Sequence, residues 1–178
     1  MSEDSEVGKR QIEDMVLDQL LDSLLILTGR AVTEEWEGVA EKLEGSPDHI
    51  IGLDGKPFGI ELTEIRDVED AQGYVDEAYR LASKKSESYS RRGIFRFPIA
   101  LALYSTTPPL IEVRESLEAT TFQPDFEALG FAEIWAADSS DAYYTPGDLR
   151  RLADIFCFKP AVWFGFHRIG SHNRKPYG

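Results

Sequence analysis

Two acidic residues lie beside or within two neighbouring stretches of sequence whose side chains alternate as in a β-strand. Asp48 immediately precedes the first stretch, Glu61 lies within the second, and Asp54-Gly55 lies between them. Asp-Gly between two alternating stretches predicts a β-hairpin closed by a type I′ turn. If Asp54 and Gly55 are the two central residues of that turn, Asp48 lies opposite Glu61, with Cβ atoms about 5 Å apart. The hairpin therefore predicts two carboxylates side by side on one face.

This pair of carboxylates could bind a divalent cation. Like charges directly opposite each other destabilise a hairpin, and a cation between them offsets the repulsion. Mg²⁺ and Mn²⁺ prefer carboxylate oxygens, water and phosphate oxygens as ligands. The alternative is that one hairpin face is simply exposed to water, where two acids are ordinary in a chain with 32 acidic residues. A β-bulge at Pro57 would also shift the register and undo the pairing.

The remaining pattern predicts a single α/β domain over residues 1–178, with a central mixed β-sheet flanked by helices. Residues 1–30 are expected to form an N-terminal helical extension, and 167–178 a basic C-terminal tail. The nearly uninterrupted apolar run 97–104 predicts a central strand that is covered on both faces. Apolar periodicity and turn residues predict helices at 6–27, 34–43, 67–90, 110–119 and 145–157, and strands at 49–53, 58–63, 97–104, 130–136 and 161–166.

The hairpin resembles the motif of the PD-(D/E)XK nuclease superfamily. Ser46-Pro-Asp-His-Ile-Ile51 opens the first strand, and Gly59-Ile-Glu-Leu-Thr-Glu-Ile65 forms the second. The likeness covers residues 33–90 best and implies a restriction-endonuclease-like core, with 97–104 as the next strand of the sheet. It also implies that Mg²⁺ or Mn²⁺ is bound by Asp48, Glu61 and the backbone carbonyl of Leu62.

The family often adds a glutamate from the preceding helix, and in this chain Glu35, or else Glu34, stands where that residue would fall. The alternative for both glutamates is a solvated first helical turn, in which acidic residues are favoured by the helix dipole.

The chain departs from the family at Thr63, where the motif has a lysine that orients or helps to deprotonate the attacking water. One explanation is that Lys85 on the following helix supplies the charge, because it lies at the border of that helix's apolar stripe. Lys85-x-x-x-Tyr89 also resembles a helix motif that some branches place beside their metal site. Alternatively, Lys85 lies along the helix flank without a partner. The third explanation is that the fold persists without catalysis.

The resemblance favours an enzyme that hydrolyses phosphodiester bonds of nucleic acid, in the first place DNA. The catalytic residues would be Asp48, Glu61 and Lys85, and the substrate contacts would come from Thr63, Tyr89, Arg174 and Lys175. The last two belong to the basic tail, for which a solvated terminus is the alternative. A net charge of −13 opposes free-standing nucleic-acid binding. The competing hypothesis is a catalytically inactive interaction module on the same fold, acting in a larger complex with a protein partner or as a homo-oligomer.

Other features narrow the range of functions. Cys157 is single and lies in an apolar run, so it is expected in the core rather than in a disulfide or metal site. The three histidines lack zinc-site spacing, and no glycine-rich nucleotide motif occurs. No apolar stretch is long enough to span a membrane, and the acidic start is unlike a signal peptide. We therefore expect a cytoplasmic protein without membrane contact.

Overall fold

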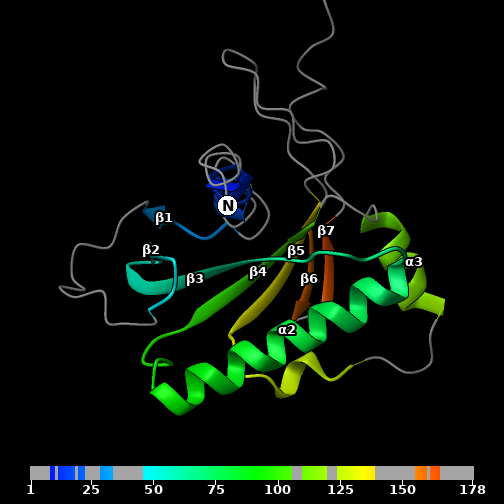
Figure 1. Cartoon of the computed structure of the whole chain (residues 1–178). Helices are drawn as coiled ribbons and strands as arrows, with labels where there is room; N and C mark the ends of the chain where they lie inside the picture. The colour runs from blue at the N-terminus through cyan, green and yellow to red at the C-terminus, as the bar shows by residue number, and fades with distance from the viewer. Residues whose placement is uncertain are drawn as a thin grey trace, which may run out of the picture.

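The described residues form one seven-stranded sheet with the strands in chain order, from β1 at one edge to β7 at the other (Figure 1). The computed structural model describes residues 9–10, 12–18, 20–22, 29–33, 46–105, 110–119, 124–138, 155–159 and 161–164. The strands are β1 (Val32–Thr33), β2 (His49–Leu53), β3 (Lys56–Glu64), β4 (Ile99–Ser105), β5 (Glu133–Asp138), β6 (Ile155–Lys159) and β7 (Ala161–Phe164). The helices are α2 (Ala71–Arg92), α3 (Leu110–Ala119), the 3₁₀ turn η1 (Phe126–Ala128) and an N-terminal helix with helical residues 9–10, 12–18 and 20–22.

The sheet is mixed, as the sequence predicts. Strands β1, β2 and β3 pair antiparallel, β3, β4 and β5 pair parallel, and β5, β6 and β7 pair antiparallel. Parallel neighbours need a long crossover. The first crossover contains α2, and the second contains α3 and η1.

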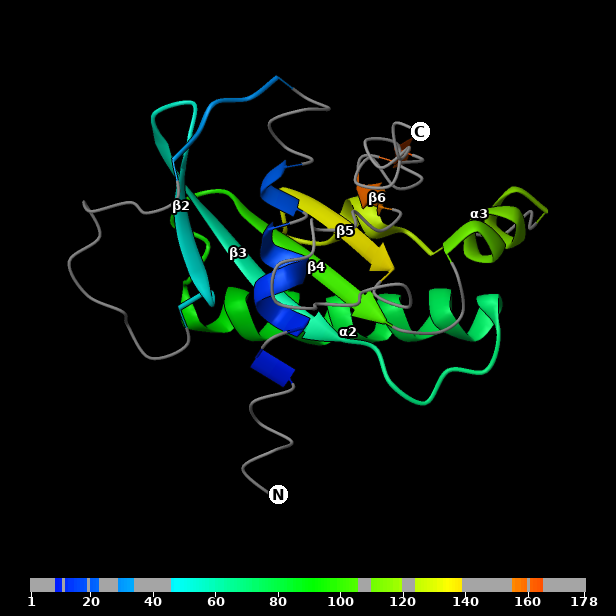
Figure 2. The same ribbon diagram turned by 90° about the horizontal axis from the view of Figure 1, so that it is seen from above.

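Helices cover both faces of the sheet: the N-terminal helix lies on one face and α2 on the other (Figures 1 and 2). The central strand β4 is buried at every position, which confirms the predicted two-sided strand. Its residues alternate between two apolar clusters, with Leu101 and Leu103 on the α2 side and Ala102 and Tyr104 on the side of the N-terminal helix.

The N-terminal helix packs onto the apolar face of the β2–β3 hairpin. Val16 and Leu20 are fully buried in the same cluster as Ile51, Phe58 and Ile60. Leu53 and Leu62 of the hairpin belong to the same cluster. The opposite face of β3 is therefore turned toward α2.

The hairpin has the predicted turn and register. Asp54 and Gly55 have φ angles of 52° and 73°, the positive pair that a type I′ turn requires. The β2–β3 ladder runs from Leu53 opposite Lys56 to His49 opposite Ile60 without a shift, so no bulge forms at Pro57.

The prediction of a helix over residues 145–157 is wrong at its C-terminal end, which is the part that the structure describes. Residues Ile155–Lys159 form strand β6, which pairs with β5 and β7. Four consecutive buried residues, 155–158, suit a strand that is covered on both faces, and a short apolar run cannot be distinguished from a buried helix by periodicity alone. The start of that predicted helix and the whole predicted helix 34–43 lie outside the described residues.

Two further features complete the fold. Val32–Thr33 form a short edge strand that no sequence pattern predicted. No helix in the described part of the chain is long and apolar enough to cross a membrane.

Candidate active site

Glu61 is a buried carboxylate on the inner face of β3. Its neighbours Ile60 and Leu62 belong to the cluster beneath the N-terminal helix, so the alternation of the strand turns Glu61 toward α2. Only 4% of the residue is exposed. Burying a charge is costly unless partners satisfy it. Both partners of Glu61 come from α2.

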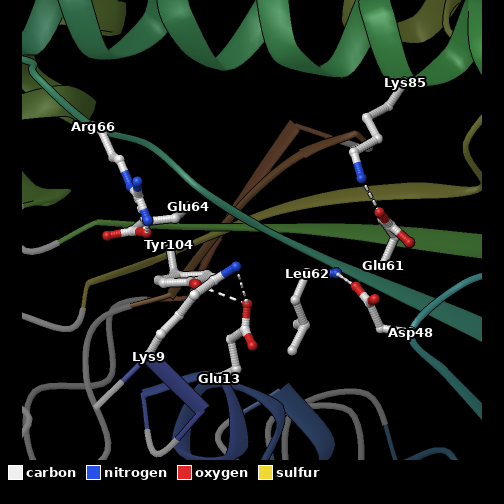
Figure 3. Close-up of polar contacts among 9 residues, drawn as sticks. All are labelled: Lys9, Glu13, Asp48, Glu61, Leu62, Glu64, Arg66, Lys85 and Tyr104. Carbon is white, nitrogen blue, oxygen red and sulfur yellow. Dashed lines mark hydrogen bonds and ion pairs between the residues drawn. The ribbon is translucent and has the colours of Figure 1, made fainter. Parts of the chain in front are cut away.

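Lys85 and Tyr89 each hold one oxygen of Glu61. The Lys85 ammonium donates to Oε1 in an ion pair (Figure 3), and the Tyr89 hydroxyl donates to Oε2 at 2.5 Å. The two residues are one turn apart on α2, which places them on the same face of the helix. Lys85 therefore has a partner, and the alternative of an unpaired lysine along the helix flank is wrong.

Tyr89 is held in its protonated form. Burial, followed by the hydrogen bond to Glu61, raises the pKa of Tyr89 far above its ordinary range. The charge of Asp48 acts in the same direction, whereas Arg92 acts against it. The phenol is therefore a permanent hydrogen-bond donor to the carboxylate at neutral pH.

Asp48 lies at the open end of the hairpin, one step beyond the pair formed by His49 and Ile60. It is exposed, and its Oδ2 accepts a hydrogen bond from the backbone N–H of Leu62 at 2.8 Å (Figure 3). The carboxylate is thereby tied to the residue that follows Glu61. The observed register, extended by one step, places Asp48 opposite Glu61 on the neighbouring strand.

The position of Asp48 also depends on the residue before it. A Cβ atom on Gly59 would lie 2.9 Å from Pro47 Cγ, and it would also meet Ile99 and Phe97 at 3.0 and 3.1 Å. Pro47 therefore packs directly on the backbone of β3, an approach that only glycine permits.

Thr63 lies two residues after Glu61, on the same side of the strand. Its Oγ1 is buried and has no hydrogen-bond partner among the described residues. A lysine at this position would compete with Lys85 for the same carboxylate. The structure thus places a neutral hydroxyl on β3 and the positive charge on α2.

The remaining predicted site residues cannot be placed. Glu35, the alternative Glu34, and the tail residues Arg174 and Lys175 lie outside the described residues, and their roles stay predictions. Leu62 lies between Glu61 and Thr63, and its backbone N–H is the group that contacts Asp48.

Asp48 and Glu61 offer carboxylate oxygens, the type of ligand that a hard cation prefers. Two carboxylates with water and phosphate oxygens are a normal environment for Mg²⁺, which rarely occupies an all-protein cage. The part of the chain that the structure describes contains no group of three His, Cys, Asp or Glu residues able to hold a metal. Asp48 and Glu61 supply two carboxylates, and both oxygens of Glu61 already accept hydrogen bonds from α2. The repulsion expected between them is already reduced, because Lys85 compensates the charge of Glu61.

Arg92 also acts on this site, although no sequence motif singled it out. The charge of Arg92 reaches the Tyr89 hydroxyl, and the two residues are three positions apart on α2. The signal was present in the spacing, because Lys85, Tyr89 and Arg92 recur at helical intervals and share one side of a helix.

No family model matches this chain, and no significant match is found among curated proteins or among solved structures. The assignment of function consequently depends on the site itself.

Proposed function

We propose that the protein is a metal-dependent nuclease that hydrolyses phosphodiester bonds of nucleic acid. The observation that carries the proposal is the ion pair between Lys85 and Glu61. In the PD-(D/E)XK pattern a lysine follows the motif acid by two residues, and here Thr63 takes that position. Lys85 brings an ammonium group to the same carboxylate from α2, so the site keeps a positive charge beside its acid.

Each residue has a task in this reaction. Asp48 and Glu61 would hold the cation, with Glu35 as a further ligand and the Leu62 carbonyl as another. A bound Mg²⁺ lowers the pKa of water and stabilises negative charge on the phosphate. Lys85, whose side chain is 36% exposed, can reach both Glu61 and solvent, as a group that orients the attacking water must. Tyr89 fixes the orientation of the Glu61 carboxylate through its hydrogen bond.

The topology also supports the proposal. The order hairpin, α2 and a strand parallel to β3 is similar to the restriction-endonuclease-like core that the sequence motif implies. The order of elements alone carries no activity, because one fold can host many functions.

The proposal is tested by cleavage assays on plasmid and single-stranded DNA with Mg²⁺ or Mn²⁺. We expect Asp48→Asn, Glu61→Gln and Lys85→Met each to reduce the rate by about 100-fold or more, the order of magnitude for loss of a group that acts in the transition state. Glu64→Gln is the matched control, because Glu64 lies on the same strand but pairs with Arg66. Undiminished cleavage by both carboxylate variants would end the assignment.

A second function is favoured by one feature of the same site. Lys85 and Tyr89 already satisfy both oxygens of Glu61. A site in which the charge of Glu61 is compensated without a cation suits a catalytically inactive interaction module that binds a protein partner or a second copy. The net charge of −13 agrees with such a module. Calorimetric titration with Mn²⁺ separates the two functions. Binding that is lost in Asp48→Asn favours the nuclease, and no binding at millimolar metal favours the module.

A further inference from the structure

The C-terminal half of α2 and the turn after it carry a concentration of positive charge in an acidic protein. Residues 84–96 contain five basic residues and one acidic residue, whereas the whole chain has a net charge of −13. We call this segment the basic end of α2. Its basic members are Lys84, Lys85, Arg91, Arg92 and Arg96.

Four of these five side chains point into solvent without an acidic partner. Lys84, Arg91, Arg92 and Arg96 are exposed, and within the described ranges none of them forms an ion pair. The only side-chain hydrogen bond described for these four residues joins Arg91 Nε to the Glu87 carbonyl at 3.4 Å. Four basic residues elsewhere in the described ranges are paired with acids, in Lys9–Glu13, Arg30–Glu133, Arg66–Glu64 and Arg80–Glu77. The basic end of α2 therefore has charge available for a ligand.

This surface is continuous with the candidate active site. Lys85 contacts Glu61, Tyr89 contacts the same carboxylate one turn later, and Arg92 lies close enough to act on the Tyr89 hydroxyl. A row of residues on one side of the helix, Lys85, Tyr89 and Arg92, thus leads from the buried carboxylate to the exposed end of α2.

The helix dipole accounts for only part of this charge. Cations are favoured in the last turn of a helix, where Arg91 and Arg92 lie, and the effect fades beyond that turn. Arg96 lies after the end of α2, and Lys84 lies two turns before it. Both are too far from the C-terminus of the helix to be explained by the dipole.

We propose that the basic end of α2 binds the phosphodiester backbone of a nucleic-acid strand and leads it to the site formed by Asp48, Glu61 and Lys85. The inference rests on the proposed function and deepens it. Guanidinium groups match phosphate oxygens in a forked geometry and remain charged at all relevant pH values. A local basic surface can attract a polyanion although the net charge of the protein is negative, because the field close to the surface depends on nearby charges.

The test measures binding without cleavage. Fluorescence anisotropy with a labelled 20-nucleotide single-stranded DNA, and with RNA of the same sequence, is recorded in EDTA over a range of salt concentrations. We compare the triple variant Arg91→Gln, Arg92→Gln, Arg96→Gln with the triple control Arg10→Gln, Lys56→Gln, Arg80→Gln. Both triples lose three positive charges, so a general effect of net charge is identical in the two proteins.

We expect the first triple to bind about tenfold more weakly or worse, and the slope of log K against log salt to fall in magnitude by about 2, because each lost phosphate contact contributes about 0.7 for single strands. The control should keep the wild-type slope. Replacement of the same three arginines by lysine should restore most of the binding, since the charge is retained. Whichever of the DNA and the RNA binds more tightly is the preferred ligand of this surface.

Equal losses in the two triples, or no binding by the wild-type protein at low salt, would overturn the inference. Arg96→Gln alone guards against a folding defect, because it lies outside the helix, and it should lower the slope by about 0.7. Failure of this inference can be distinguished from failure of the proposed function. If cleavage requires Asp48 and Glu61 but the first triple binds as tightly as the wild type, only the binding surface is refuted. If the first triple selectively loses binding but the wild-type protein cleaves no substrate, only the nuclease is refuted.

Discussion

The Tyr89 hydroxyl donates a hydrogen bond of 2.5 Å to Oε2 of Glu61, so that α2 and β3 are joined through a buried carboxylate. Lys85 holds the other oxygen of the same group from one helical turn earlier. Removal of either partner leaves a buried negative charge with less compensation. The stability of the fold and the geometry of the candidate active site therefore depend on the same contacts.

Tyr89→Phe should destabilise the protein by about 1.5–3 kcal/mol, the usual contribution of a hydrogen bond to a charged group. The change keeps the ring, which packs against Phe95 and Phe131, and removes only the hydroxyl. Urea unfolding measures the difference. Tyr79→Phe is the control, because Tyr79 is partly buried on the same helix and contacts Phe126 through its ring. Equal effects of the two substitutions would contradict a special role of the Glu61 contact.

Lys85→Met should destabilise the wild-type protein by about 1–3 kcal/mol but should cost less in a Glu61→Gln background. The reason is that the lysine compensates a buried charge, and no such charge remains once Glu61 is neutral. A double-mutant cycle in urea should give a coupling energy between about 0.5 and 3 kcal/mol. Lys84→Met is the matched control on the exposed side of the helix and should show no coupling to Glu61. A zero coupling energy for Lys85 would mean that the ion pair contributes nothing to folding.

Gly59→Ala should destabilise the protein by about 1–3 kcal/mol, because the new methyl group would overlap Pro47, Ile99 and Phe97. Relief of the overlap displaces Pro47, and with it Asp48. If the protein cleaves nucleic acid, its rate should therefore fall more than its stability explains. Gly55→Ala provides the comparison: it costs about 1 kcal/mol through its positive φ, meets no atom within 4 Å, and should leave the rate unchanged. Identical cleavage rates in Gly59→Ala and Gly55→Ala would show that the position of Pro47 does not affect the site.

The stability of the protein should fall in alkaline solution partly because of Cys157. Burial raises the pKa of the Cys157 thiol to about 12, whereas in an unfolded chain the thiol ionises near pH 8.5. Its contribution is complete below about pH 8.5 and decreases by up to about 1.4 kcal/mol per pH unit as the pH rises from there toward the folded pKa. Urea unfolding of the wild type and of Cys157→Ala between pH 7.5 and 10 should show this additional slope in the wild type only. Parallel pH profiles of stability in the two proteins would contradict a raised pKa of the Cys157 thiol.

Local chemistry in the sequence determined the hairpin and its register. Asp54-Gly55 accepts the positive φ angles of a type I′ turn, and a two-residue turn leaves a single possible pairing of the flanking residues. The apolar run of β4 likewise predicted a strand covered on both faces. These features depend on neighbours in the chain, which a sequence displays directly.

The tertiary structure decided the questions that involve distant segments. Lys85 and Glu61 are 24 residues apart, and helical periodicity could place the lysine only at the border of the apolar stripe. Whether it met a partner depended on how α2 packs across the sheet. The same limit explains the error at residues 155–159, because a short apolar run is compatible with helix or strand until the neighbours β5 and β7 supply hydrogen bonds. Packing between elements, which no local pattern encodes, thus placed the positive charge of the site on α2.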